Sequence, residues 1–431
     1  EVKTKGGSTQ QVIFPGAVAA YRSEEIPIQL LTTKIGSSTE SIINGSTESL
    51  EYELMKAVRK FSIALKPKVG FLQGQKELST RHVADAANSM SEFYEVDTVE
   101  IKQQLSALKG YKAIIIAKPD TAFDEKDKFI IDQFIMHGGK VLWLVEEMQI
   151  TMDSIAKTGQ NIAVPKNLNL ADQLFKYGVR VNDDLLMDLQ AAPIPIVTGR
   201  VGNKPEQNLF PWYFSPLFNP TSNHPIVYNL NAIKGEFSSS LDTIEVPGVK
   251  KTILLTTSKY SKNVQSPVRV SLNMLQTEPD PAMFNKPHIP IAVLLEGTFH
   301  SVFANRLPQE LLADTAIHFL DSSKENKMIV ISDGDIISNY ANDRGKMYPL
   351  GFDRYTNQMY GNKNFILNCI DYLCGNENVV ALRGKEFRIR LLDKAKTENA
   401  SLSWFALLLP VVLICIYGVI HFYLRRKKYA S

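Results

Sequence analysis

The sequence predicts an α/β protein: a parallel-sheet domain with a β-rich insertion, a partial α+β domain before it and a transmembrane helix after it. Three observations carry this prediction. Between residues 67 and 145, apolar runs alternate with helical patterns, which is typical of parallel strands covered by helices on both faces. A strand, loop and helix pattern returns at 327–375. An uncharged apolar segment then runs from Trp404 to Tyr423.

Length and composition allow several domains and exclude some partners. The chain has 431 residues, of which 44% are hydrophobic and 22% charged, with a formal net charge of +3. A charge balance this close to neutral gives no reason to expect nucleic acid as a partner. Three cysteines do not make a disulfide framework. The first residues resemble the middle of a hairpin and lack an initiator Met, so we expect further sequence upstream.

Residues 1–65 are expected to form part of a small α+β domain. Short strand patterns separated by turn signals occupy residues 11–31. Apolar residues from Leu50 to Leu65 recur on one helical face. The preceding segment, Ser46 to Ser49, offers several N-caps, so we expect the helix to begin there.

The α/β domain is expected to begin at residue 66, with a first part that ends at 180. Near-continuous apolar runs such as Ile114 to Ile116 are typical of central parallel strands. The pattern predicts strands at 69–72, 96–101, 111–117 and 140–145, with helices at 83–94 and 126–137.

This order of strands and helices resembles the class I glutamine amidotransferase-like fold. Enzymes of that fold carry a Cys nucleophile where a strand turns into a helix, activated by a His. Here the strand that ends at Val145 is followed by Glu146 and Glu147, and the first cysteine of the chain is Cys369. A phosphate-binding P-loop motif is also absent from the sequence. We therefore expect no enzymatic activity, and we expect the two glutamates to be exposed loop carboxylates.

Residues 181–325 are predicted to form a β-rich insertion that contains a segment rich in proline and aromatic residues, from Leu209 to Pro220. Exposed aromatic side chains beside prolines form grooves and protein contact surfaces, which makes Trp212 and Tyr213 candidate contact residues. Alternatively, these rings fill the junction between the β-rich part and the sheet. The sequence favours neither arrangement over the other.

Residues 326–396 are predicted to close the α/β domain with a strand, a polar loop and a helix. The strand runs into Asp333-Gly334-Asp335, and loops at the carboxyl ends of parallel strands are where ligands and partners bind. The two carboxylates could ligate a hard cation with Asp343 or Asp353. Asp-Gly also ends many strands without a metal, and we expect neither metal nor cofactor. The candidate contact residues here are Asp333, Asp335, Asn339, Tyr348, Phe352, Asp353 and Tyr355.

Residues 402–424 are predicted to form a transmembrane helix, and 425–431 a basic cytoplasmic tail. No Asp, Glu, Lys or Arg occurs in the 20 residues from Trp404 to Tyr423, which is long enough to cross a bilayer. Aromatic residues mark both ends, and the basic cluster that follows indicates a cytoplasmic C-terminus. Pro410 is tolerated in a membrane helix. The anchor residues are Trp404, Pro410, Tyr423, Arg425, Arg426, Lys427 and Lys428.

Individually uncommon motifs are spread over nearly the whole chain. They are Phe14-Pro15-Gly16-Ala17, Ser49-Leu50-Glu51-Tyr52-Glu53-Leu54, Phe210-Pro211-Trp212, Asn223-His224-Pro225-Ile226, Val330-Ile331-Ser332-Asp333-Gly334-Asp335, Pro349-Leu350-Gly351-Phe352-Asp353 and Tyr360-Gly361-Asn362-Lys363-Asn364-Phe365. Together they resemble the GldG family of gliding-motility-associated ABC transporter substrate-binding proteins.

The resemblance implies a bacterial inner-membrane protein whose bulk lies in the periplasm. Its implied partners are a GldF-like ABC permease, a GldA-like ATPase, the lipid bilayer and other cell-envelope motility proteins. The expected role is that of a non-enzymatic subunit that binds a partner or cargo and docks on the permease. The alternative is a tethered periplasmic receptor for a small molecule or glycan.

Overall fold

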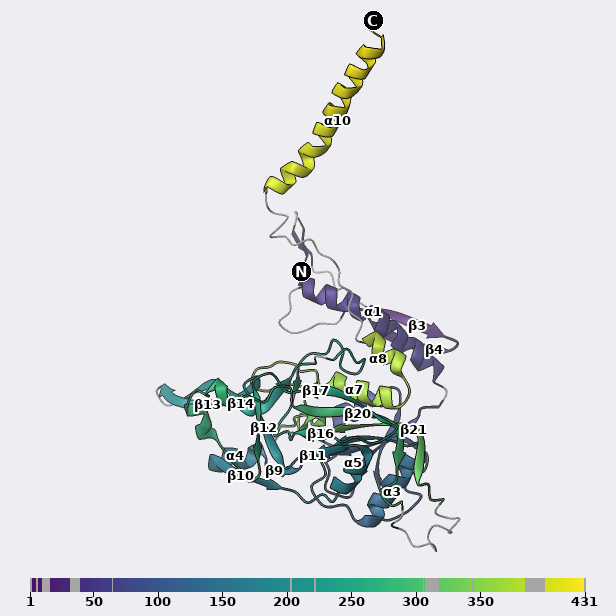
Figure 1. The fold of residues 1–431 in the computed structure, drawn as a ribbon, viewed down its shortest axis with the longest axis vertical. Helices are drawn as coiled ribbons and strands as arrows, with labels where there is room; N and C mark the ends of the chain where they lie inside the picture. Colours follow the sequence, from purple (N-terminus) through teal and green to yellow (C-terminus); the bar gives the residue numbers. More distant parts are fainter. Residues whose placement is uncertain are drawn as a thin grey trace. The chain divides into compact units, whose positions relative to one another are not determined.

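The computed structural model describes residues 2–4, 7–9, 16–31, 39–63, 65–201, 204–220, 222–304, 306, 318–342, 345–383 and 400–429. Residues 1–385 form one compact unit and 386–431 a second, and each is described by itself. A seven-stranded sheet in the order β17-β20-β21-β8-β7-β5-β6 lies at the centre of the first unit (Figure 1). In chain order its strands are β5 (Lys68–Gln73), β6 (Glu95–Glu100), β7 (Tyr111–Ala117), β8 (Lys140–Leu144), β17 (Val249–Thr256), β20 (Pro290–His300) and β21 (Ser322–Ile331).

Five neighbouring strands of this sheet, from β6 to β21, are parallel, and β20 and β17 continue it in antiparallel pairing. Leu142 of β8 pairs with Ile115 of β7 on one side and Ile329 of β21 on the other. The prediction of a mixed α/β protein with a parallel sheet is thereby confirmed. Two strands from the stretch 181–325, β17 and β20, belong to the central sheet itself. The amidotransferase-like topology and the domain boundaries stay predictions.

Helices cover both faces of the sheet. Successive side chains of a strand point to opposite faces, so Leu142 packs in a different core cluster from its neighbour Trp143. The cluster around Leu142 includes residues of α2 and α7, and the cluster around Trp143 includes residues of α3 and α5. The helices are α2 (Ala84–Met90), α3 (Glu125–Met136), α5 (Ala171–Tyr177), α7 (Asn362–Leu373) and α8 (Glu377–Arg383).

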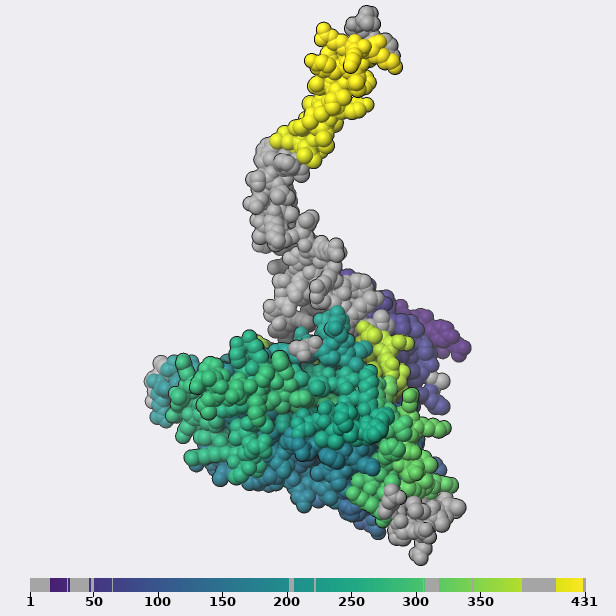
Figure 2. Space-filling view, viewed as in Figure 1, coloured from purple at the N-terminus to yellow at the C-terminus, as the bar shows by residue number. Residues whose placement is uncertain are grey.

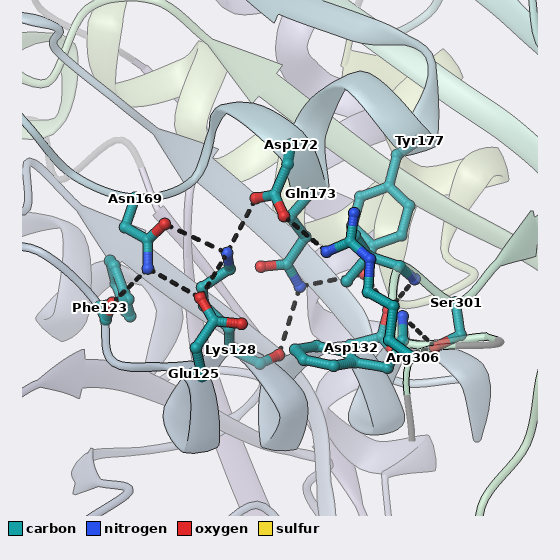
Figure 3. Close-up of polar contacts among 12 residues, drawn as sticks. Phe123, Glu125, Lys128, Asp132, Asn169, Asp172, Gln173, Tyr177, Ser301 and Arg306 are labelled. Carbon is teal, nitrogen blue, oxygen red and sulfur yellow. Dashed lines mark hydrogen bonds and ion pairs between the residues drawn. The ribbon is translucent and has the colours of Figure 1, made fainter. Parts of the chain in front are cut away.

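A buried polar network joins α3 to α5 and to the segment after β20 (Figure 3). Asp132 is fully buried and accepts hydrogen bonds from the Tyr177 hydroxyl at 2.9 Å and the Ser301 hydroxyl at 2.6 Å. One helical turn earlier, Lys128 is 1% exposed and its Nζ lies 2.8 Å from Asp172. The network satisfies these charges away from water, which is the condition for burying them.

The β-rich part adds small antiparallel sheets. Atoms coloured teal to green, from the middle of the sequence, cover much of the face seen in Figure 2. It also contains two short 3-10 helices, Leu272–Gln276 and Pro281–Met283, and helix α4 (Met152–Thr158) precedes it in the chain. The strands of the small sheets, of which β9 and β10 come before residue 181, are β9 (Met148–Gln149), β10 (Gln160–Pro165), β11 (Val179–Val181), β12 (Asp184–Asp188), β13 (Ala191–Val201), β14 (Lys204–Phe218), β15 (Ile233–Lys234), β16 (Leu241–Thr243), β18 (Ser261–Gln265) and β19 (Val268–Ser271).

The segment rich in proline and aromatic residues is strand β14, paired with β13 in a hairpin that extends from the side of the unit (Figure 1). The register shifts between Ala191 and Pro193, at the kind of irregularity where prolines without an N–H are tolerated. Trp212 is 1% exposed and Phe214 is fully buried. The rings therefore fill a core of the β-rich part. This agrees better with the alternative in which the rings are packed inside than with the one in which they form an exposed groove.

The N-terminal elements are two hairpins followed by a long helix. The strands are β1 (Val2–Thr4), β2 (Gly7–Thr9), β3 (Gly16–Tyr21) and β4 (Glu24–Gln29), and the helix is α1 (Thr39–Ser62). Helix α1 already includes Ser46 to Ser49, so the prediction that these residues cap it was wrong. The expected strand at 12–14 and the segment 384–399 lie outside the described residues.

The second unit contains helix α10 (Ala400–Tyr429), which includes Pro410. Its segment Leu408–Lys428 has a mean hydropathy of 1.9 and is long and apolar enough to cross a membrane. Trp404 lies in this helix, but its side chain is outside the described part of the chain.

Candidate functional site

Three charged side chains meet at the carboxyl ends of the parallel strands. Lys118 follows β7, Glu146 comes shortly after β8, and Asp335 begins the 3-10 helix Asp335–Ile337 after β21. The Lys118 Nζ lies 2.8 Å from Glu146 and 2.6 Å from Asp335. Position 334 must be glycine for this approach, because a Cβ there would lie 2.5 Å from the Lys118 side chain. The parallel register thus gathers residues from three distant parts of the sequence.

Burial sets the electrostatics of this cluster. Glu146 is fully buried, and burial raises its pKa to about 8 although Lys118 favours the ionised form. Desolvation disfavours the charged form of Lys118, but Asp335 and Glu146 outweigh it and hold the pKa of Lys118 above its ordinary value. The lysine therefore stays charged and lies between the two acidic side chains.

Asp333 is fully buried and connects the end of β21 to the loop after β15. Its carboxylate accepts hydrogen bonds from the backbone N–H of Glu236 at 2.9 Å and of Asp335 at 2.9 Å, and from the Ser238 hydroxyl. Burial first, and the charge of Asp335 second, raise the pKa of Asp333 to about 7. Gly235 allows this contact, since a Cβ there would lie 2.5 Å from Asp333 Oδ2. The role visible for Asp333 is to position the loop.

A cavity of about 330 Å³, here called the strand-end cavity, lies beside the cluster. Asn339 forms part of its wall while fixing the loop, because its side chain accepts a hydrogen bond from Asp85 N–H at 3.2 Å and donates one to the Arg81 carbonyl at 3.2 Å. The predicted contact residues that line this cavity are Trp212, Asp335, Asn339, Phe352, Asp353 and Tyr355.

The two other predicted aromatic residues do not line the cavity. Tyr348 stacks on Phe352 with ring centroids 5.0 Å apart, so it supports a lining residue from behind. Tyr213 is 8% exposed and packs edge-on against Phe284, with centroids 6.0 Å apart. The structure thus gathers six of the nine predicted contact residues around one cavity, and places Asp333, Tyr348 and Tyr213 outside its wall.

Arg354 forms a cationic rim to the cavity. Its guanidinium lies 4.6 Å from the ring centroid of Tyr340 and 4.7 Å from that of Tyr355, in cation–π geometry. Next to it, Asp353 is 2% exposed and accepts a hydrogen bond from Lys234 Nζ at 3.1 Å. Asp353 and Lys234 neutralise each other, so the guanidinium of Arg354 is the exposed positive charge of this rim.

Glu236 supplies a carboxyl group to the same wall. No hydrogen bond or ion pair to its carboxylate is formed by the described residues, and burial followed by the charge of Asp335 raises its pKa. Sequence reasoning missed Glu236, Lys234, Arg354 and Lys118, and the expectation that Glu146 and Glu147 are exposed was wrong, since they are 0% and 8% exposed. The sequence carried one signal for their burial, since both glutamates come shortly after β8, a strand buried on both faces.

The metal alternative finds no support among the described residues, where no group of three or more His, Cys, Asp and Glu side chains is placed to hold an ion. The Asp333 oxygens are engaged by hydrogen bonds, and Asp353 is paired with Lys234. Asp343 lies outside the described residues.

Comparison with known proteins decides the family. Residues 66–369, which include the central sheet and the strand-end cavity, match the model of a family described as "ABC-type uncharacterized transport system". The chain belongs to this ABC-type transport family. The family assignment suggests that the protein is an auxiliary component of an ABC transport system. Such a component has a non-catalytic role and associates with the transporter. The apolar helix α10 is consistent with a membrane-associated member of the family.

Matches to individual proteins add little to the family assignment. No curated protein matches the chain. Among solved structures, the mmIFT52 N-terminal domain is 14% identical, with a TM-score of 0.41 over 71% of this chain and 97% of that domain. The exo-beta-1,4-mannosidase Op5Man5 from Opitutaceae bacterium strain TAV5 is 11% identical, with a TM-score of 0.24 over 77% of this chain and 38% of the enzyme. Likenesses this distant carry no argument about function.

Proposed function

We propose that the protein is a non-enzymatic, membrane-anchored subunit of an ABC transporter complex required for gliding motility. The observation that carries the proposal is one chain that joins a transport-family region, residues 66–369, to a helix apolar enough to cross a membrane. Helix α10 docks on a GldF-like permease, which a GldA-like ATPase drives. The part of the proposal that concerns gliding motility rests on the GldG-like motifs of the sequence.

The charge pattern around α10 supports an orientation. Arg425, Arg426, Lys427 and Lys428 directly follow the apolar segment, and basic clusters beside membrane helices remain in the cytoplasm. The large unit then lies in the periplasm of an inner-membrane protein. Movement of the permease during nucleotide hydrolysis reaches the periplasm through the anchored helix.

The strand-end cavity is the proposed contact site for a partner or cargo. It lies at the carboxyl ends of parallel strands, where open α/β sheets bind their ligands. An exposed guanidinium at Arg354 and the half-buried carboxyl group of Glu236 offer a cation and a hydrogen-bonding acid to an incoming group. A volume of about 330 Å³ accommodates one or two side chains of a partner.

The test is co-purification of the full-length protein from gently solubilised membranes, followed by mass spectrometry. The matched variant replaces residues 408–424 with polyleucine of equal length and keeps Arg425 to Lys428, so that anchoring is retained while the helix surface changes. We expect the permease and ATPase to co-purify with the native helix and to be lost with polyleucine. Recovery of the native protein alone, under conditions that preserve other transporters, would overturn the subunit proposal.

The alternative is a tethered receptor, and the size of the strand-end cavity is the observation that favours it. Ligand pockets start at roughly 300 Å³, so the cavity is large enough for a small molecule or monosaccharide. A ligand that binds the folded protein raises its melting temperature by mass action. Two results together would favour the receptor. The protein would co-purify without the permease, and a ligand would raise the melting temperature of the native protein but not of the Glu236→Gln variant.

A further inference from the structure

A second and larger cleft, of about 1060 Å³, lies apart from the strand-end cavity. Its walls come from the segment after β8, the segment before α5, the connection between β11 and β12, and the segment that leads into β20. The two cavities share no lining residue. We call it the Glu147 cleft, after the acid in its wall.

Glu147 is the unusual group of this cleft. It is 8% exposed, yet no described residue forms a hydrogen bond or ion pair with its carboxylate. Its neighbour Glu146 turns to Lys118 at 2.8 Å, whereas Glu147 lines the cleft. A largely buried carboxylate without a partner is disfavoured in its ionised form, and a cationic group that enters the cleft would favour that form.

The surrounding charges do not compensate Glu147. The charged side chains that face it are Asp183, which repels its ionised form, and Lys166, which attracts it. Lys166 is already paired with Asp120 at 3.2 Å. The cleft therefore contains two carboxylates, Glu147 and Asp183, and the lysine that attracts Glu147 is engaged with Asp120.

The other charged residues of the wall have partners of their own. Arg180 lies 2.6 Å from Asp242, and Lys286 Nζ donates to the Asn263 side chain at 2.7 Å. Asp172 is held by Lys128 at 2.8 Å and by Arg306 at 3.0 Å (Figure 3). His288 is exposed on the same wall. None of these groups is placed to neutralise Glu147.

We propose that the Glu147 cleft binds a peptide through a primary amine that pairs with the carboxylate of Glu147. An ammonium group supplies the missing positive charge, with Asp183 as a second acceptor at the rim. Asn167 and Gln265 are exposed on the wall, where their amides can exchange hydrogen bonds with peptide groups. Trp, Tyr and Phe, the large rings on which sugars usually stack, are absent among the described residues that line the cleft. The inference concerns other residues than the proposed function and does not rest on it.

Binding of this kind is linked to a proton. Burial first, and Asp183 second, raise the pKa of Glu147 to about 7, while Lys166 opposes them. A bound ammonium favours the ionised carboxylate, so a peptide that binds protonated Glu147 displaces its proton to solvent. With a pKa of about 7 in the free protein, the affinity should rise about tenfold from pH 6 to pH 8.

The experiment is calorimetry on the full-length protein in detergent. The probe is Ala-Lys-Ala, acetylated at its N-terminus and amidated at its C-terminus, so that the lysine amine is its single charge. The control ligand carries Nε-acetyl-lysine in the same peptide. Titrations at pH 7 in buffers of different ionisation enthalpy count the released protons, and we expect about half a proton for each peptide bound.

We expect the lysine peptide to bind at least about tenfold more tightly than its acetylated form. Glu147→Gln should remove both this preference and the proton release, whereas Glu278→Gln, at an exposed acid away from the cleft, should change neither. A thermal melt confirms that each variant is folded. Equal binding of the two peptides, unchanged binding by Glu147→Gln, or no binding at millimolar concentration overturns the proposal. Preference for an uncharged oligosaccharide over the lysine peptide would overturn it as well.

Discussion

Arg59 of helix α1 and Asp371 of helix α7 form an ion pair with 3.0 Å between Nη1 and Oδ1, and their side chains are only 10% and 4% exposed. The Tyr94 hydroxyl completes the contact, because it donates to Asp371 at 2.7 Å and accepts from Arg59 at 3.1 Å. The Arg59 guanidinium also lies 4.2 Å from the Phe93 ring centroid. This contact fastens the N-terminal helix to the α/β sheet domain.

Arg59→Ala should loosen helix α1. Removal of the cation takes the ion-pair partner away from the buried Asp371 carboxylate, and breaking a buried pair in this way costs about 3 kcal/mol. Amide hydrogen exchange along α1 should accelerate roughly a hundredfold, while exchange in the central sheet stays slow. The matched control is Lys60→Ala at the exposed neighbouring position, and equal exchange in the two variants would show that the ion pair does not hold the helix.

Asp132→Ala should destabilise the whole first unit. Asp132 is fully buried and accepts hydrogen bonds from Tyr177, Ser301 and the backbone N–H of Val302 (Figure 3). Truncation leaves these donors unsatisfied, and each buried unsatisfied donor costs about 1 to 3 kcal/mol. We expect a loss of at least about 3 kcal/mol in the free energy of unfolding by urea denaturation.

The exposed Asp321 provides the control for that change, because Asp321→Ala removes a carboxylate that contacts only Ser322, at 3.2 Å, among the hydrogen bonds described for it. Its effect should stay within about 0.5 kcal/mol. An Asp132→Ala protein as stable as the Asp321→Ala protein would mean that water satisfies the network after truncation.

The central sheet was predictable because local sequence carries the relevant signal. A strand buried on both faces must be apolar throughout, so the run from Ile114 to Ile116 identifies it without knowledge of its neighbours. The end of such a strand is also local information, and for this reason Asp335 and Asn339 could be named as candidate contact residues. The aromatic residues of the loop followed the same reasoning.

The partners of these residues were not predictable from local sequence. Lys118 meets Asp335 only because β7 and β21 are held in register by β8 between them, and no short-range pattern encodes that order. Burial of Glu147 likewise depends on the segments that lead into β12 and β20, far along the chain. Charged residues after a strand are usually exposed, and that general rule misled the expectation here.

Arg354→Ala should weaken partner binding at the strand-end cavity while leaving the fold intact. The side chain is exposed and rests on Tyr340 and Tyr355, so its loss removes cation–π contacts worth about 1 kcal/mol at most. If the partner presents an acidic group to this rim, recovery of the partner in co-purification should fall at least about fivefold. The control is Arg269→Ala, at an exposed arginine bound to Gln160 on β10. If both variants recover the partner equally well, Arg354 does not belong to the contact surface.

Glu147→Gln should stabilise the protein, and more so at higher pH. The pKa of Glu147 is about 7 in the folded protein and 4.5 for the ordinary side chain, so the folded state holds the proton more tightly. Stability from this group is fully present below pH 4.5 and is lost as the pH rises to 7, because the unfolded chain ionises first. Glutamine mimics the protonated acid. Its advantage should be about 1 kcal/mol at pH 5 and about 3 kcal/mol at pH 8, measured by urea denaturation of the full-length protein.

The control for this pH dependence is Glu278→Gln, at an exposed acid outside both cavities, which should change stability little at either pH. A gain that is the same at pH 5 and pH 8 would point to packing rather than ionisation. A loss of stability at pH 8 would mean that an unseen cation already neutralises Glu147. A gain that grows with pH would show that the carboxylate is kept at a cost to folding, which is the pattern expected of a residue retained for binding.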